Sequence, residues 1–398
     1  MPPRPPPARK FGAPLFFCTF TDSSDGTEVV LGGGGGASST GVANRLLLVP
    51  VEENETSKRA ASGPHKYQLE CDPSSELHTG SLTVVSGTWV EKKPYFLSVL
   101  SGGEGLVKYK LDQGKDGKKE FAQLKYDKAK LESLKQAEIK TVVSNNAGTQ
   151  VAVGFDTGKI VVYGVEGLES LRTFDPEKHE KVLPSKGGIM SLCFTPCDSK
   201  LVAVKDNGTA FVWDQAPKDT KKKAKKKGSS VVTKFPTDAG LFRGCHAWEA
   251  SNAKTYFCLG VNGKNRRSKV STWVLTGKDA KIAAMQTSRP AHSAAITALA
   301  GARANKLVAT ASSEGEICVY SLEHKLALLQ RVPNAHMIFV TNLGFSRDGK
   351  RLVSCSADAG ARILTITKTG DQIAMERNLL IALLFLVIAL LLALLGQR

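Results

Sequence analysis

The feature that most constrains this chain is a repeated pattern of short apolar runs separated by polar turns. In the clearest copy, runs at 189–194, 201–204 and 209–214 alternate with turns at 198–199 and 206–208. Further copies begin near residues 15, 95, 141, 256, 295 and 339. A sheet this small cannot bury both faces alone, so the copies must stack against one another. Seven copies predict an all-β fold, a seven-bladed β-propeller over residues 11–370.

Composition predicts the segments outside the blades. The Pro-rich start, residues 1–10, is expected to be disordered, and its prolines make it a poor donor of a closing strand. Residues 218–229 form a Lys-rich insertion between the third and fourth strands of the fourth blade. Residues 371–378 are predicted to link the propeller to a transmembrane helix at 379–396.

The C-terminal helix is predicted from the unbroken apolar run at 379–395. As a helix this run spans about 26 Å, close to the roughly 27 Å of the endoplasmic reticulum bilayer. A buried core helix is the alternative, but a run without a polar face has no side to turn to solvent. We therefore expect a single C-terminal anchor that leaves the propeller in the cytosol.

Charge and cysteine content indicate which partners the protein has and whether its compartment is reducing. The formal net charge is +17, and part of it lies in the lysine run Lys221–Lys227. That run is read as a solvated loop, with contact to anionic lipid as the functional alternative. It has no interleaved aromatic residues, so no nucleic-acid partner is expected. The eight cysteines are scattered without zinc-ligand spacing and are read as reduced core residues.

Two histidines, His292 and His336, each precede the first strand of a copy. In such repeats a histidine bonds the acidic residue of a turn and stabilises the blade, with Glu314 and Asp358 as candidate partners. A catalytic histidine is the alternative. No nucleophile or metal partner stands near either one in sequence, so the structural role is favoured and no catalytic residue is assigned.

A glycine-rich stretch interrupts the first copy. Five consecutive glycines, Gly32–Gly36, are followed by Ala37-Ser38-Ser39-Thr40-Gly41-Val42-Ala43-Asn44, between strand-like runs at 28–31 and 45–49. Each of these glycines loses more backbone entropy on folding than any other residue would. A run of five therefore indicates a need that only glycine meets: a positive φ angle, close approach of another molecule to the backbone, or an ion held by backbone groups. A flexible hairpin is the plain alternative. A phosphate-binding P-loop is not favoured, since no Gly-Lys-Ser/Thr follows and a strand rather than a helix comes next.

Three features together resemble one family of WD-repeat proteins. These are the glycine run with Gly41-Val42-Ala43-Asn44, the last copy with its 339–346 and 354–358 segments, and the apolar run behind it. The chain resembles the endoplasmic reticulum exchange factors that start COPII coat assembly. That family includes the prolactin regulatory element-binding protein and the plant phosphate transporter traffic facilitators.

The resemblance implies a guanine-nucleotide exchange factor for a Sar-type small GTPase, without covalent chemistry. It implies that a potassium ion shapes the glycine-rich loop, with Gly41 and Asn44 as candidate ligands, and that Val42 is an exposed tip that wedges into the GTPase. The resemblance also places the protein at the endoplasmic reticulum membrane. The candidate GTPase-contacting residues are Gly32, Gly33, Gly34, Gly35, Gly36, Thr40, Gly41, Val42 and Asn44.

Two other functions remain open at this stage. One is a non-catalytic, membrane-anchored WD-repeat helper that assists export of specific membrane cargo. The other is a generic tethered scaffold, or a nucleic-acid regulator that uses Lys221–Lys227. The intact glycine-rich stretch favours the exchange factor, because a loop without a function has no reason to keep so costly a composition.

Overall fold

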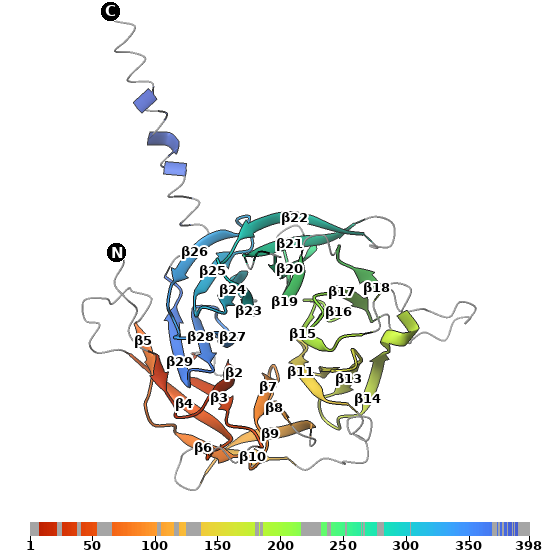
Figure 1. Ribbon diagram of the computed structural model, residues 1–398, viewed down its shortest axis with the longest axis vertical. Helices are drawn as coiled ribbons and strands as arrows, with labels where there is room; N and C mark the ends of the chain where they lie inside the picture. Colours follow the sequence, from red (N-terminus) through yellow and green to blue (C-terminus); the bar gives the residue numbers. More distant parts are fainter. Residues whose placement is uncertain are drawn as a thin grey trace, which may run out of the picture.

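The structure is a computed structural model that describes most residues between 8 and 388. It does not describe 1–7, 22–25, 38–40, 54–65, 102–104, 115–118, 125–136, 180–182, 184–185, 216–231, 237–239, 251–252, 264, 266, 277–281, 303, 368–371 and 389–398. Between 372 and 388 it describes 372, 375, 378–379, 381–383, 385 and 387–388. The described residues form a ring of seven antiparallel sheets around a central axis (Figure 1). The seven-bladed propeller predicted from the repeats is confirmed.

Each sheet is one blade, with its strands following one another from the axis to the rim (Figure 1). Blades one to three contain β2 (Leu15–Phe20), β3 (Glu28–Gly33), β4 (Arg45–Glu53), β5 (Tyr67–Leu69), β6 (Ser75–His78); β7 (Val84–Trp89), β8 (Tyr95–Leu100), β9 (Gly105–Gln113), β10 (Lys119–Gln123); β11 (Ile139–Ser144), β12 (Gln150–Phe155), β13 (Ile160–Gly164) and β14 (Ser170–Phe174). A short 3-10 helix, η3 (Pro176–His179), follows.

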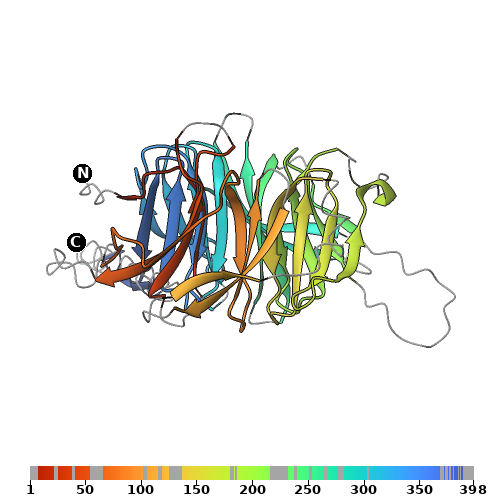
Figure 2. The same cartoon turned by 90° about the horizontal axis from the view of Figure 1, so that it is seen from below.

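The remaining blades repeat this order. They contain β15 (Ile189–Phe194), β16 (Lys200–Lys205), β17 (Ala210–Asp214), β18 (Val232–Lys234); β19 (Leu241–Glu249), β20 (Thr255–Asn262), β21 (Ser268–Thr276), β22 (Ile282–Pro290); β23 (Ile296–Ala302), β24 (Leu307–Ser312), β25 (Ile317–Ser321), β26 (Ala327–Val332); β27 (Val340–Phe345), β28 (Arg351–Ser356), β29 (Gly360–Thr365) and β1 (Arg9–Lys10). Seen from the side, the strands cross the thickness of the ring (Figure 2).

The hydrophobic core is divided among the seven spaces between neighbouring blades. Each hydrophobic cluster draws its buried residues from two adjacent blades, including one cluster that joins blade seven to blade one. Burial of apolar surface stabilises a fold in rough proportion to the area removed from water. Every blade therefore shares its core with both neighbours, and closure of the ring buries the last of these clusters.

The N-terminal segment closes the ring, contrary to the expectation from its prolines. β1 pairs with β29, with Arg9 opposite Ala361 and Lys10 opposite Gly360. The Lys10 ammonium lies 3.2 Å from Asp358 Oδ1. The prolines end at Pro7, so Arg9 and Lys10 keep the N–H groups that a ladder requires. Arg9 and Lys10 were predicted to belong to the disordered start, and this is wrong, because they form the closing strand; residues 1–7 lie outside the described residues.

The innermost strands share a local irregularity that the sequence pattern does not reveal. In all seven blades the pairing of the innermost strand with its neighbour shifts register near the start of that strand, for example between Leu15 and Phe17 and between Val340 and Asn342. A bulge of this kind bends the strand and increases its twist. Here it lies at the start of every strand that faces the central axis.

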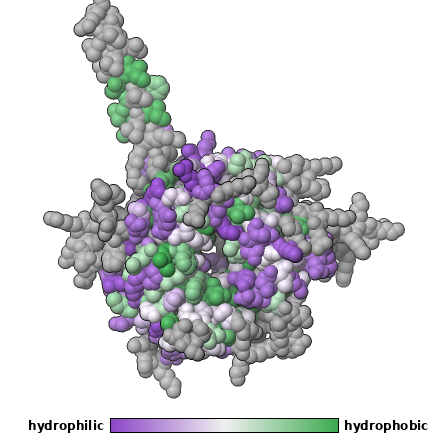
Figure 3. All heavy atoms as spheres, viewed as in Figure 1, coloured by the Kyte–Doolittle hydropathy of each residue, from purple (hydrophilic) through white to green (hydrophobic). Residues whose placement is uncertain are grey.

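The C-terminal apolar run lies largely outside the described residues. Those described between 372 and 388 are helical, and Leu379, Phe385 and Val387 are exposed. The described apolar residues of this segment stand apart from the blades (Figure 3). Among the residues that the structure describes, no helix has both the length and the apolar character needed to cross a membrane. The predicted helix at 379–396 stays a prediction, and the lysine run lies outside the described residues.

Candidate functional site

The glycine-rich loop connects β3 to β4, and its first part is buried inside the first blade. A Cβ atom on Gly33 would lie 2.0 Å from the carbonyl oxygen of Pro14, and one on Gly32 would lie 2.6 Å from Val84 Cγ1. Gly34 has a φ of +149° and donates its N–H to the carbonyl of Pro14 at 2.9 Å. Close packing inside the protein therefore requires these three glycines.

The side chain of Asn44 closes the loop. Its Oδ1 accepts hydrogen bonds from Gly36 N at 2.9 Å and from Thr83 Oγ1 at 2.7 Å. Its Nδ2 donates to the carbonyls of Gly36 and Gly80, both at 2.9 Å. The side chain is buried and uses all of its donor and acceptor positions. Asn44 thus joins the two ends of the loop to each other and to the segment that leads into blade two.

Asn44 does not fit the potassium ligand that the resemblance implies. An amide oxygen has two lone pairs, and both already accept hydrogen bonds from Gly36 and Thr83. A cation at Oδ1 would have to displace at least one of these donors. The described contacts therefore assign to Asn44 the closing role that the resemblance assigns to an ion.

The predicted contact residues differ in their exposure to solvent. Gly32, Gly33 and Gly34 are buried and hold the base of the loop, while Gly35 and Gly36 are half-buried. Gly41 is exposed, has a φ of +72°, and a Cβ atom there would meet nothing within 4 Å. Thr40 lies outside the described residues.

Val42 was expected to be an exposed tip, and this is wrong. Val42 is half-buried, whereas its neighbours Gly41 and Ala43 are exposed. The next residue but one, Asn44, is buried. The surface that the described part of the loop offers to a partner is therefore Ala37 and the segment from Gly41 to Ala43.

Sequence reasoning missed the residues that support this loop. The carbonyl of Asn44 accepts a hydrogen bond from Thr79 N at 3.0 Å, next to the contacts from Gly80 and Thr83. Arg45 donates to the carbonyl of Phe11 and to Glu76 Oε1, each at 3.1 Å. These partners are about 30 or more positions away in the chain, and no short-range motif marks them.

An exposed apolar segment lies on the same side of the ring as the loop. Met337, Ile338 and Phe339 precede β27 and are 83%, 41% and 43% exposed. The next strand starts beside β2, since Thr341 Oγ1 donates to the carbonyl of Leu15 at 2.7 Å. In Figure 3, apolar residues gather beside the channel over the inner strands. The loop and this segment thus flank the start of β2.

His292 has a structural environment. Its Nδ1 lies 2.7 Å from Glu316 Oε2 and its Nε2 lies 2.9 Å from Thr310 Oγ1. The expected partner Glu314 is therefore wrong; the carboxylate comes from two residues further along. Burial lowers the pKa of His292, and the contact with Glu316 offsets this only in part. Cys318 is also near, but both ring nitrogens already have protein partners and need no metal.

His336 occupies a similar position in blade seven and lies near the expected Asp358, but at a longer distance than His292 from Glu316. Its Nε2 lies 2.8 Å from Ser354 Oγ, and its Nδ1 lies 3.6 Å from Asp358 Oδ1. Burial raises the pKa of Asp358, but His336 and the N–H groups of Met337 and Gly360 outweigh this and hold it below its usual range. Both histidines are buried, which supports stabilisation of the blades over catalysis.

The cysteines are all free thiols. Six of them are buried, and only Cys71 and Cys197 are exposed. Burial raises the pKa of Cys245 and Cys258 above the ordinary thiol value. This agrees with reduced residues that pack in the core.

Comparisons with known proteins agree with this fold. Residues 177–214 and 328–363 match the family described as WD domain, G-beta repeat. The first of these segments ends at Trp213-Asp214. Two crystal structures of Sqt1 from Chaetomium thermophilum share the fold. One has a TM-score of 0.57 at 15% identity and covers 89% of this chain and 82% of that one. The other, bound to the N-terminus of the ribosomal protein L10, has a TM-score of 0.59 at 14% identity and covers 90% and 98%.

One curated relative is similar to part of this chain. The chain is 26% identical over 231 residues to SEC12-like protein 2 of Arabidopsis thaliana, a match that covers 57% of this chain and 54% of that protein. The match therefore spans about half the length of the relative. The chain thus contains WD repeats, forms a seven-bladed ring, and is similar over part of its length to SEC12-like protein 2.

Proposed function

We propose that this protein is a guanine-nucleotide exchange factor for a Sar-type small GTPase at the endoplasmic reticulum, where it starts COPII coat assembly. The observation that carries the proposal is the construction of the glycine-rich loop. Its base is fixed by Asn44 and by buried glycines, while Gly41 and Ala43 face outward. A loop held at its base and open at its far side is suited to enter a partner.

Exchange requires only differential binding. A factor accelerates nucleotide release when it binds the nucleotide-free GTPase more tightly than the loaded one. A thousandfold faster release corresponds to a barrier lower by about 4 kcal/mol. A rigid loop supplies this difference in binding free energy better than a flexible one, because a rigid loop loses less conformational entropy on binding. The hydrogen bonds of Asn44 provide that rigidity here.

The apolar segment at Met337, Ile338 and Phe339 supports a second contact with the same partner. It flanks the start of β2 on the side of the ring that carries the loop. Exposed apolar residues of this size, clustered in one segment, are typical of protein contact sites. A GTPase bound to the loop would cover both the loop and this apolar segment, and the second contact would hold the GTPase in place while the loop inserts.

The test is release of a fluorescent GDP analogue from the Sar-type GTPase of the same organism. We expect residues 1–370, which contain all seven blades, to accelerate release. Gly41→Arg and Asn44→Ala should remove most of the acceleration, and Phe339→Ala should weaken binding of the nucleotide-free GTPase. The matched control is Leu171→Ala, which truncates an exposed aliphatic residue in blade three.

Potassium and sodium buffers are compared in the same assay. Because protein groups close the loop at Asn44, we expect acceleration in both buffers. No acceleration by the folded propeller would reject the exchange factor and leave the non-catalytic export helper as the better function.

A further inference from the structure

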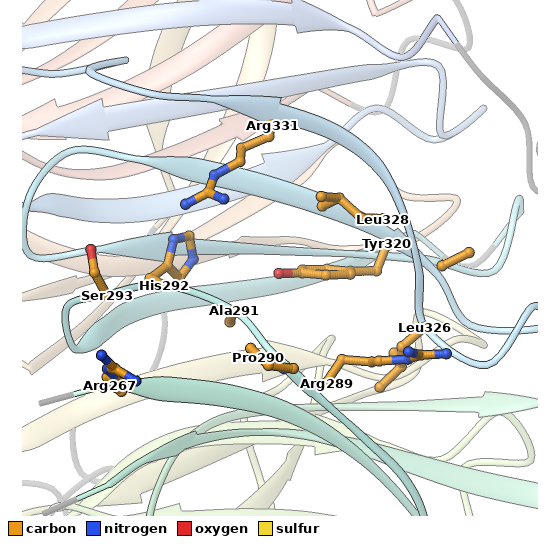
Figure 4. Close-up of a pocket in the computed structure, with 11 residues that line it drawn as sticks. Arg267, Arg289, Pro290, Ala291, His292, Ser293, Tyr320, Leu326, Leu328 and Arg331 are labelled. Carbon is orange, nitrogen blue, oxygen red and sulfur yellow. The ribbon is translucent and has the colours of Figure 1, made fainter. Parts of the chain in front are cut away.

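A groove on the rim of the ring lies between blades five and six, far along the chain from the glycine-rich loop. Its cavity has a volume of about 530 Å³ and is bounded by the end of β22, the segment that follows it, and strands β25 and β26 (Figure 4). Neither the proposed exchange reaction nor the stability of the blades uses this space.

The floor of the groove is apolar. Ala291, Tyr320 and Leu326 are nearly fully buried and belong to the cluster that joins blades five and six. Pro290 and Leu328 form its sides, and Leu328 remains 45% exposed. An occupant would therefore cover an existing apolar surface without opening the core.

Three arginines surround this floor. Arg267 and Arg331 lie toward one end of the groove and Arg289 toward the other, with Tyr320 between them (Figure 4). Arg331 Nε pairs with Glu316 Oε1 at 2.6 Å, and Glu316 is not one of the residues that line the groove. Arg289 Nε donates to the carbonyl of Lys325 at 3.4 Å. Among the described residues that line the groove, none is acidic.

Two of the three arginine charges, those of Arg267 and Arg289, are not neutralised within the described part of the chain. There, neither Arg267 nor Arg289 forms an ion pair with a carboxylate. A guanidinium binds carboxylates with planar, charge-assisted hydrogen bonds. The groove thus combines cationic ends with an apolar middle.

We propose that this groove binds a short extended peptide segment that carries acidic residues at both ends and aliphatic residues between them. The acidic side chains bind Arg267 and Arg331 at one end and Arg289 at the other, and the aliphatic ones lie over Ala291, Tyr320 and Leu328. β26 is the outermost strand of its sheet, so its outer edge offers backbone groups to an extended chain. A flat lipid surface does not reach a floor that lies between two blades.

The experiment measures binding of a fluorescein-labelled peptide, Asp-Leu-Val-Leu-Asp, to the full chain by fluorescence anisotropy. We expect saturable binding with a Kd on the order of 10–100 µM, typical of a small interface. The same peptide with Asn in place of Asp should bind at least about tenfold more weakly, because the charged contacts are lost.

Variants locate the binding site. Arg267→Gln and Arg289→Gln should each weaken binding several-fold, and Leu328→Glu should abolish it, because it places a negative charge beside the acidic peptide. All three residues have exposed side chains, so the melting temperature should stay near that of the wild type. Arg347→Gln, in blade seven, is the matched arginine control and should bind as the wild type does.

Three results would overturn the proposal. The first is acidic-peptide binding that Arg267→Gln, Arg289→Gln and Leu328→Glu leave unchanged, and the second is the absence of binding at millimolar peptide. The third is displacement of the peptide by phosphatidylserine vesicles but not by phosphatidylcholine vesicles, which would assign the groove to anionic lipid. The glycine-rich loop lies in blade one, so this site can be present whether or not the protein catalyses nucleotide exchange.

Discussion

Asn44 in blade one accepts a hydrogen bond from the hydroxyl of Thr83, which precedes blade two, at 2.7 Å. This contact makes the glycine-rich loop part of the joint between two blades. The shape of the loop and the stability of the ring are therefore coupled. A substitution at Asn44 affects both, and the two effects must be measured separately.

Replacement of Asn44 should destabilise the propeller. Asn44→Ala leaves the Thr83 hydroxyl and two backbone carbonyls without their present partner, and we expect a loss of roughly 3 kcal/mol in the free energy of unfolding. Urea unfolding followed by tryptophan fluorescence measures it. Asn265→Ala, at an exposed turn residue, is the control and should change stability by less than about 0.5 kcal/mol. Equal effects of the two would contradict the closing role of Asn44.

Two glycines of the loop should differ in their tolerance of a methyl group. Gly33→Ala would place a Cβ atom 2.0 Å from the Pro14 carbonyl, so we expect a loss of roughly 3 kcal/mol. At Gly41 the space is open and only the positive φ opposes alanine, so a loss of about 1 kcal/mol is expected. Thermal melting of the two variants compares them directly. A reversed order would mean that the loop packs differently from this structure.

Truncations at the N-terminus should separate the proline-rich start from the closing strand. Removal of residues 1–7 should leave the melting temperature almost unchanged. Removal of residues 1–11 deletes β1, its contact between Lys10 and Asp358, and the buried Phe11, and should cost about 2–4 kcal/mol. If both truncations melt as the full chain does, β1 does not close the ring.

Acid should destabilise the protein as pH falls below about 6.5. Burial lowers the pKa of His292 and His336 in the folded chain. The unfolded chain therefore binds protons first, near the ordinary imidazole pKa of about 6.5, and stability is lost as pH falls through that range. Asp358, whose folded pKa is lowered, adds a second loss below about pH 4.

The matching measurement is melting temperature between pH 7.5 and 5.5. His336→Gln should be less stable than the wild type at pH 7.5 but should lose less stability on acidification. His78→Gln is the control, because His78 is exposed and should leave the slope unchanged. An identical slope in His336→Gln and the wild type would mean that His336 is not the titrating group.

The number of blades could be predicted from the sequence because each strand and turn is determined by residues that are close together in the chain. The turn at Asp206-Asn207-Gly208 and the apolar runs around it predict three strands without reference to the rest of the chain. The same holds for the last copy, where His336 and Asp358 were paired correctly. The partner of His292 was missed, since two glutamates in one turn, Glu314 and Glu316, satisfy the same pattern and only the backbone direction chooses between them.

The sequence by itself determined the propeller, the place of the glycine-rich loop between β3 and β4, and the need for glycine there. The tertiary structure alone decided which glycines are buried, that Val42 is half-buried, that Asn44 bonds to Gly80 and Thr83, and that β1 closes the ring on β29. It also brought Arg267, Arg289 and Arg331 to one groove. The reason is physical: strand formation depends on nearby residues, whereas these contacts join residues that meet only after the blades have packed around the axis.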